Sequence, residues 1–228
     1  MVHVEYLRGE SMAAFMRNNG LTLTIFGFFL LFLSAESVTG YHSYNEDRQD
    51  HHWPRVSYGS YIVSGSFLES TMENWESEFL EMAAYVVLTA FLFQKGSPES
   101  KSPIDTGSDE SRSAVTSRSP WPVRRGGLAL KIYKRSLSLA FCVLFALAFS
   151  LHAYGGWHAF NEQQQMHGER PISLPDFLGN SHFWYQSFQN WQSEFLGLGA
   201  MILLSIWLRQ EGSPQSKPVE APHEQTGQ

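Results

Sequence analysis

The sequence predicts an all-α integral membrane protein whose four transmembrane helices form two tandem-duplicated helical hairpins. Three observations predict this fold class. Apolar residues gather in four blocks that are separated by polar segments, the chain aligns with itself at a shift of 116 residues (137 − 21), and lysine and arginine concentrate on one set of connecting segments.

An internal repeat relates residues 21–101 to residues 137–217 without a gap, and 28 of the 81 aligned positions are identical. Unrelated segments would share roughly one position in fifteen. Two motifs recur within the repeat, Asn-Trp-x-Ser-Glu-Phe-Leu and Gly-Ser-Pro-x-Ser-Lys, at 74–80, 190–196, 96–101 and 212–217. The repeat therefore indicates a tandem duplication and predicts two copies of one structural unit.

The first predicted transmembrane helix covers about 20–41, after a cytoplasmic segment at 1–19. Residues 18–35 carry no charge, and about 20 residues of helix suffice to cross the hydrocarbon core of a bilayer. A cleaved signal peptide is the alternative interpretation. The repeat argues against it, because the matching apolar block at 137–151 lies in the middle of the chain.

The second and fourth predicted spans cover about 75–95 and 191–210. The charge-free run of the second block, 82–94, is short for a membrane span. Its counterpart, 180–208, contains Glu194 as its only acid and is long enough to cross. The duplication therefore predicts that both segments cross the membrane.

The third span is predicted over about 136–157, which gives repeat units at 20–95 and 131–211. The linker at 96–130 is rich in serine, proline, glycine and charged residues, and this composition predicts a disordered segment. The polar tail at 212–228 is predicted to be mobile and cytoplasmic.

Capping signals predict several helix boundaries. Ser173, followed two residues later by proline, predicts a short helix in the second outer loop. Ser66 and Ser181 are predicted to begin the helices that lead into the second and fourth spans. Gly96 and Gly212 are predicted to be the C-terminal caps of these helices.

The distribution of lysine and arginine predicts the orientation in the membrane. The N-terminal segment, the stretch from 95 to 135 and the C-terminal segment from Arg209 onward carry 2 + 9 + 2 = 13 such residues, whereas the predicted outer loops carry only Arg48, Arg55 and Arg170. Positive charge marks the cytoplasmic side, so both termini and the linker are predicted to be cytoplasmic. The two hairpins then share one topology, as in parallel-repeat membrane proteins.

Ionisable residues within membrane spans are costly to bury and often functional. Four such residues form a candidate intramembrane site for a proton or a cation: Glu36, His152, Glu78 and Glu194. The alternative is that the carboxylates only stabilise helix starts. Trp75 and Trp191 are predicted to anchor the helices at the membrane interface.

A candidate metal site combines imidazole and carboxylate groups of the outer loops, a ligand set that suits zinc. Its residues are His42, Glu46, His51, His158, Glu162 and His167. The spacing matches no established metal motif, and the alternative is that these side chains bind water at the membrane surface.

Composition excludes several function classes. The net charge of −6 and the absence of a basic stripe argue against a nucleic-acid partner. One cysteine, Cys142, cannot form an intrachain disulfide. No catalytic motif is present, so neither an enzymatic activity nor a cofactor is predicted. The predicted partners are the lipid bilayer and a second copy or another membrane protein.

On the paired motifs, together with the aromatic-Asn-Glu sequence and downstream histidine of each outer loop, the chain resembles an uncharacterised family of small bacterial multi-pass membrane proteins, described as a domain of unknown function. The resemblance covers about 18–217. It implies a bacterial plasma-membrane protein and brings no activity or ligand. The predicted function is therefore a non-enzymatic scaffold, interaction or envelope protein. The alternatives are a small proton or cation transporter or channel, and a metal-binding membrane protein.

Overall fold

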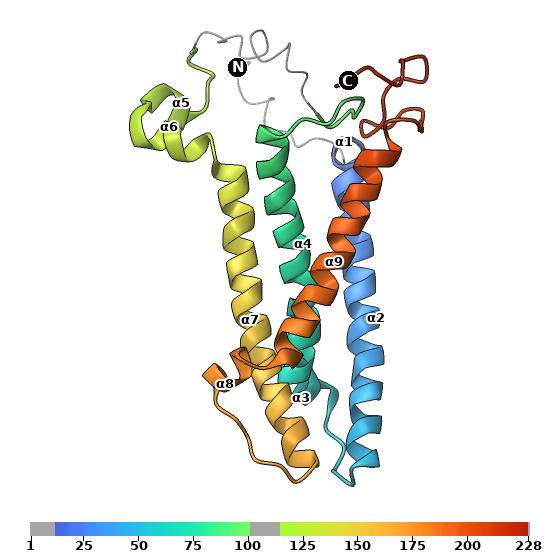
Figure 1. Cartoon of the computed structure of the whole chain (residues 1–228), viewed down its shortest axis with the longest axis vertical. Helices are drawn as coiled ribbons and strands as arrows, with labels where there is room; N and C mark the ends of the chain where they lie inside the picture. Colours follow the sequence, from blue (N-terminus) through green and yellow to red (C-terminus); the bar gives the residue numbers. More distant parts are fainter. Residues whose placement is uncertain (1–11, 101–114, 228) are drawn as a thin grey trace, which may run out of the picture.

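The computed structural model describes residues 12–100 and 115–227, and these residues contain helices and no strand. In chain order the helices are α1 (Met12–Asn18), α2 (Gly20–Asp50), α3 (Tyr58–Ile62), α4 (Gly65–Phe91), α5 (Trp121–Arg125), α6 (Gly127–Tyr133), α7 (Ser136–Met166), α8 (Leu174–Leu178) and α9 (Ser181–Leu204). The four long helices, α2, α4, α7 and α9, follow the long axis of the molecule (Figure 1). The short helices α3 and α8 lie at one end, and α1, α5 and α6 lie at the other.

Helices α2 and α7 extend beyond the predicted spans 20–41 and 136–157. Each is 31 residues long, which corresponds to a rise of about 46 Å against a hydrocarbon core of about 30 Å. The polar ends of these helices contain no helix breaker until His52 and Gly168, which adopt left-handed backbone conformations with φ values of 61° and 76°. The chain therefore leaves the helix several turns later than hydropathy alone predicts.

The short helix predicted after Ser173 is confirmed as α8, and the equivalent residue Ser57 precedes α3. The Ser173 hydroxyl accepts a hydrogen bond from Asp176 N at 3.4 Å, and the Ser57 hydroxyl accepts one from Ser60 N at 3.2 Å. Each serine satisfies one of the free N–H groups at a helix start.

Helices α4 and α9 both begin ten residues before the predicted spans 75–95 and 191–210 (75 − 65 and 191 − 181). The hydroxyl of Ser64 accepts a hydrogen bond from Phe67 N at 3.2 Å, so α4 begins one residue before the predicted Ser66. The first residue of α9 is the predicted Ser181.

Both helices end earlier than predicted, and the glycine caps are not where the motifs place them. The C-terminal caps are Leu92 and Ser205. Gly96 and Gly212, with φ values of 83° and 78°, lie in polar turns beyond the helix ends. Serine hydroxyls accept hydrogen bonds from the backbone N–H groups of residues 94 and 210 in these turns, which gives the chain an alternative to the helix.

The predicted linker is partly helical. Residues 121–125 and 127–133 form α5 and α6, and the guanidinium of Arg125 lies 5.0 Å from the centre of the Trp121 ring. Residues 121–125 and 127–130 of the predicted disordered linker 96–130 are thus helical, whereas residues 101–114 lie outside the described residues.

The C-terminal tail folds back onto the turn that follows α4. The Lys217 side chain is 1% exposed, and its Nζ donates hydrogen bonds to the carbonyls of Gly96 at 2.7 Å, His223 at 2.8 Å and Gln225 at 3.1 Å. The described tail therefore packs against this turn, because a buried ammonium group requires several acceptors.

The closest helix packing joins α4 and α7, and α9 packs against α4. Glycine permits the short distance between α4 and α7. A Cβ atom at Gly155 would lie 2.7 Å from Glu69 N, and a Cβ atom at Gly65 would lie 2.6 Å from the Cβ of His158. Small residues allow helix backbones to approach closely in membrane proteins.

Positions 116 residues apart make matching contacts. The Asn45 side chain accepts a hydrogen bond from Val56 N at 2.8 Å, and the Asn161 side chain accepts one from Ile172 N, also at 2.8 Å. The rings of Phe29 and Trp75 lie 5.7 Å apart, and those of Phe145 and Trp191 lie 6.2 Å apart. The two halves thus use the same residues to connect helix ends and neighbouring helices.

Helices α2 and α7 present most of their apolar surface outward. They are the two helices of the described chain that are long and apolar enough to cross a membrane, with mean hydropathies of 1.9 and 2.0 over their most apolar windows. Only 6% and 17% of the residues in these windows are buried. The core helix of a water-soluble protein would bury this surface.

Candidate functional site

The candidate site lies where α4 crosses α7, around the side chain of His152. His152 comes from α7 and is fully buried. Its Nδ1 lies 2.9 Å from an Oε atom of Glu76, which comes from α4 and is also fully buried. An imidazole and a carboxylate from different helices therefore form a hydrogen-bonded pair that is closed to solvent.

Helix α9 completes the surroundings of Glu76. The second carboxylate oxygen of Glu76 accepts hydrogen bonds from the Ser187 hydroxyl at 2.8 Å and from the Trp191 indole at 3.2 Å. Three donors from two helices thus hold this buried carboxylate, which satisfies the condition for burying a charged group.

The other side of the imidazole faces a second carboxylate on α4. His152 Nε2 lies 3.9 Å from Oε2 of Glu73. Both of these atoms are buried, and neither has a hydrogen-bond partner. Buried polar atoms without partners are rare and are frequently functional. A shift of about 1 Å would bring this pair to hydrogen-bond distance.

A third acid of α4 continues this line toward the end of the molecule where α3 and α8 lie. Glu69, Glu73 and Glu76 follow one another at helical spacing, so their side chains share one face of α4. The amide of Gln186 on α9 donates a hydrogen bond to Glu69 at 3.0 Å. The face of α4 toward α7 and α9 therefore carries three carboxylates within about 11 Å of helix length.

A cavity of about 250 Å³ reaches Glu69 from this end of the molecule. Its lining is mostly polar and includes Tyr44, Glu162, His182 and Gln186. Such a cavity has room and partners for several water molecules. Glu69 is thus the member of the acidic line that borders the cavity.

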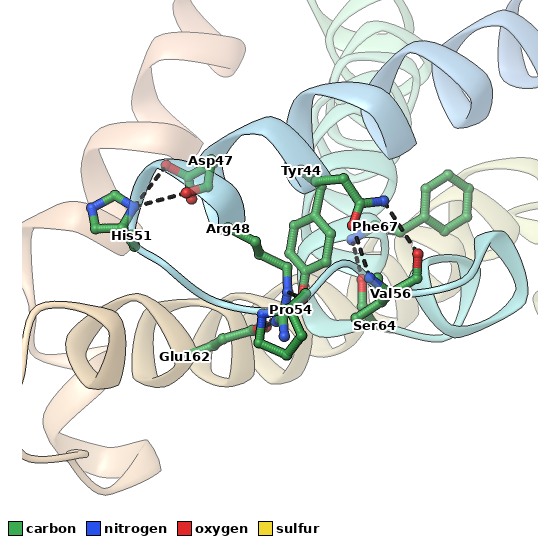
Figure 2. A network of polar contacts seen from close by, with 10 residues as sticks. Tyr44, Asp47, Arg48, His51, Pro54, Val56, Ser64, Phe67 and Glu162 are labelled. Atoms are coloured by element: carbon green, nitrogen blue, oxygen red, sulfur yellow. Dashed lines mark hydrogen bonds and ion pairs between the residues drawn. The ribbon is translucent and has the colours of Figure 1, made fainter.

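An ion pair between α2 and α7 lies beside the cavity, which Tyr44 and Glu162 line; Figure 2 shows this ion pair. Arg48 forms a short ion pair with Glu162, and the Tyr44 hydroxyl donates hydrogen bonds to the same carboxylate at 2.6 and 2.7 Å. Arg48 is also fixed by the carbonyl of Pro54 at 2.9 Å. These contacts hold the ends of the two helices together next to the line of acids.

Tyr61 of α3 supports the same end of α2. Its ring packs against Gly40, where a Cβ atom would lie 2.2 Å from the phenol oxygen. Burial, and then the charge of Glu36, raise the pKa of the Tyr61 phenol above its ordinary value. The phenol therefore remains neutral in this packed position.

The four residues of the predicted intramembrane site do not converge. Glu36 lies away from His152 and accepts a hydrogen bond from the Ser70 hydroxyl at 3.4 Å. Glu78 and Glu194 lie together in a separate group that also contains Glu81. Of the predicted set, His152 alone belongs to the site at the helix crossing.

The structure adds Glu69, Glu73 and Glu76 to the candidate residues. Sequence reasoning missed them because they precede the charge-free run of the second span. Their helical spacing of four and three residues was the available signal. It does not identify the partner, since only the packing of α4 against α7 brings these acids to His152.

The candidate metal ligands are spread over several places. His42 lies against the ring of Tyr41, and His158 lies between the rings of Tyr154 and Trp157. Glu162 is taken by Arg48 and Tyr44, and Glu46 is exposed. His51 and His167 do meet, with ring centres 4.8 Å apart. Among the described residues, the one group that could hold a metal through three side chains is Glu78, Glu81 and Glu194.

The two predicted tryptophan anchors differ in their surroundings. Trp75 packs against Phe29 of α2. Trp191 packs against Phe145 of α7, and its indole nitrogen is directed inward to Glu76. Trp191 therefore belongs to the candidate site as a hydrogen-bond donor.

Comparison with known proteins gives one match. The family described as Domain of unknown function (DUF6766) matches residues 12–228. No curated protein and no solved structure is significantly similar to the chain. The prediction of an uncharacterised family is confirmed by this match.

Proposed function

We propose that this chain, which belongs to the family described as Domain of unknown function (DUF6766), is a four-span membrane protein that transfers protons through the buried His152 site.

In the proposed topology, all four long helices cross the membrane. Helices α2 and α7 have the length and exposed apolar surface of membrane-spanning helices. Helix α4 runs beside them, and α9 crosses at an incline over the same length of the molecule (Figure 1), so a bilayer that contains the first pair also contains the second. The repeat and the matching contacts of the two halves support two duplicated hairpins.

The proposed location in a bacterial plasma membrane is supported by the distribution of positive charge and by the resemblance to bacterial membrane proteins. Lysine and arginine are concentrated in the N-terminal segment, the stretch from 95 to 135 and the tail. The described parts of these segments lie at one end of the molecule (Figure 1). We therefore infer a plasma-membrane protein with both termini in the cytoplasm, and the cavity beside Glu69 then faces outward.

One observation supports the proposed proton path. His152 Nε2 and Glu73 Oε2 are both buried, lie 3.9 Å apart and have no hydrogen-bond partner. A neutral imidazole accepts a proton at one nitrogen while it donates from the other. A proton on Glu73 can thus move to Nε2 while the Nδ1 proton moves to Glu76. One proton enters the imidazole and one leaves, so its charge is unchanged.

Polar groups continue the path at both ends. Glu69 connects Glu73 to the outer cavity. Toward the cytoplasm, the Tyr85 hydroxyl of α4 donates a hydrogen bond to Glu99 at 2.6 Å. Chains of ionisable side chains of this kind are used as proton relays in membrane proteins.

A scaffold role would not need these residues. Burying a histidine and its acidic partners costs free energy that apolar side chains of similar volume would not cost. The geometry therefore favours proton transfer over the scaffold interpretation.

The experiment uses the purified protein in liposomes that contain a pH-sensitive dye, with a potassium gradient and a potassium carrier to drive protons inward. We expect acidification in wild-type vesicles and a rate close to that of empty vesicles for His152→Asn and Glu73→Gln. His158→Asn and Glu46→Gln serve as matched controls, because both residues are exposed, and should retain the wild-type rate. Equal rates in wild-type and empty vesicles would refute the proposal.

A further inference from the structure

Two histidines at equivalent positions of the repeat meet where the long helices α2 and α7 end. His51 is the C-terminal cap residue of α2, and His167 is that of α7. The two positions are 116 residues apart (167 − 51), and their ring centres lie 4.8 Å apart with an angle of 66° between the ring planes. Each copy of the repeat thus contributes one imidazole to a single place.

Hydrogen bonds fix the tautomer of both rings. His51 Nδ1 lies 2.9 Å from the carbonyl oxygen of Asp47, and His167 Nδ1 lies 2.8 Å from that of Gln163. Because a carbonyl oxygen can only accept, each Nδ1 carries a proton, and the lone pair of the neutral ring is on Nε2. No described residue forms a hydrogen bond with either Nε2 atom. Histidines that bind metals typically show this arrangement, in which the other ring nitrogen donates to a carbonyl or a carboxylate.

The electrostatics of this place favour a cation. The C-termini of two 31-residue helices meet here, and each helix C-terminus carries about half a negative charge. The Asp47 carboxylate lies 3.5 Å from His51 Nδ1 and adds a full negative charge (Figure 2). Two protonated imidazoles at this spacing would repel each other, whereas one metal ion places positive charge between two neutral rings.

We propose that His51 and His167 bind one divalent transition-metal ion through their Nε2 atoms. A zinc–nitrogen bond of about 2.0–2.1 Å puts each ring centre about 3.2 Å from the ion, so two rings at an angle of about 90–110° have centres about 4.5–5.2 Å apart. The observed spacing of 4.8 Å lies within this range. Both rings are partly exposed, which leaves the remaining coordination positions to water.

The chemistry of the ligands identifies the class of metal. Imidazole nitrogen suits Zn²⁺, Cu²⁺ and Ni²⁺, whereas Ca²⁺ and Mg²⁺ prefer oxygen ligands. Affinity at such a site follows the general order in which Cu²⁺ exceeds both Ni²⁺ and Zn²⁺. The site is therefore expected to take zinc or copper and to discriminate against calcium and magnesium.

This site goes beyond the proposed proton transfer, because the contacts of the two histidines do not include His152. It lies at the edge of the cavity that reaches Glu69, since Asp47 and Gln163, whose carbonyls orient the two rings, line that cavity. A bound metal ion would join α2 to α7 there, next to the ion pair of Arg48.

The test uses Zn²⁺ as the probe and the full chain, purified in detergent without a histidine tag. Isothermal titration calorimetry should show one Zn²⁺ per chain, and Zn²⁺ should raise the Tm, because the two ligands are held together only in the folded protein. Cu²⁺ should bind more tightly than Zn²⁺, and a large excess of Ca²⁺ or Mg²⁺ should not displace Zn²⁺.

Variants of the two histidines test the ligands. His51→Asn and His167→Asn should each weaken Zn²⁺ binding by about tenfold or more and abolish the rise in Tm. The double variant should weaken binding little further, because both rings hold the same ion. A Tm close to the wild-type value in the absence of metal shows that these variants fold.

Two matched controls complete the experiment. His52→Asn changes the exposed neighbour of His51, and asparagine also adopts the left-handed conformation found there, so this variant should bind Zn²⁺ like the wild type. His152→Asn should also bind normally, so that a failure of proton transfer would not affect this result. No saturable Zn²⁺ binding, wild-type affinity in His51→Asn or His167→Asn, or displacement by Ca²⁺ would overturn the proposal.

Discussion

His152 differs from its counterpart in the repeat, Glu36, and this difference gives the two halves different chemistry. The acids that face His152, Glu73 and Glu76, correspond to glutamines in the second copy. Glutamine keeps the hydrogen-bonding capacity of these positions and removes their charge. Among these equivalent positions, an imidazole therefore meets carboxylates at the crossing of α4 with α7.

A second difference between the copies concerns the backbone. His52 adopts a left-handed conformation with φ of 61°, and Gly168 occupies the equivalent position with φ of 76°. A side chain at such a position costs about 1 kcal/mol relative to glycine, because its Cβ approaches the following carbonyl.

We therefore predict that His52→Gly raises the stability of the protein by about 0.5–1 kcal/mol. Gly168→Ala is the matched change in the other copy and should lower stability by a similar amount. Thermal unfolding in detergent, followed by circular dichroism, measures both effects. A fall in Tm for His52→Gly would show that its side chain contributes contacts that outweigh the backbone strain.

Two pairs of helices occupy equivalent positions in the sequence, α4 with α7 and α9 with α2, but only one pair packs closely. Helix α4 packs tightly on α7, whereas the corresponding pair, α9 and α2, is not closely packed. Gly155 and Gly65 of the close interface correspond to Thr39 and Ser181 in the other pair. Larger side chains hinder the same close approach of the backbones, so the two pairs of helices pack differently.

We predict that Gly155→Ala destabilises the protein by about 1–3 kcal/mol, because the new methyl group would have to displace the backbone of α4 at Glu69. Gly197→Ala on α9 is the control, since nothing lies within 4 Å of its added Cβ atom. We expect a lower Tm and a lower proton-transfer rate for Gly155→Ala alone. Equal Tm values for both variants would contradict a close α4–α7 crossing.

The whole molecule separates charge and apolar surface along its long axis. The apolar sides of α2 and α7 face outward over the middle of the molecule. At one end, the buried Lys217 connects the tail to the turn after α4. At the other end, the ion pair of Arg48 with Glu162 joins α2 to α7. At both ends, segments that lie far apart in the sequence are thus held together by polar contacts.

The proposed topology makes a prediction about these two ends. In a Cys142→Ser background, single cysteines at Ser60 and Glu169 should react with a membrane-impermeant maleimide in intact cells, since these exposed residues lie at the outer end. A cysteine at Ser117 should react only after permeabilisation. Labelling of residues 60 and 169 from opposite sides would exclude two hairpins of the same orientation.

Much of the fold was predictable from local patterns. The apolar blocks, the repeat and the serine caps predicted where helices form, because these signals depend on neighbours in the chain. The helix ends were less predictable. Whether a polar segment remains helical depends on competing hydrogen bonds, such as those of the serines after α4 and α9.

The sequence by itself determined an all-helical protein that includes two long apolar helices, and it singled out His152 but not the acids that face it. Only the tertiary structure decided which of these residues meet. Helical spacing places Glu73 and Glu76 on one face of α4, but the small residues of α7 determine that this face meets His152. The hydrogen-bond partners of this site come from different helices, and their pairing depends on how closely those helices pack.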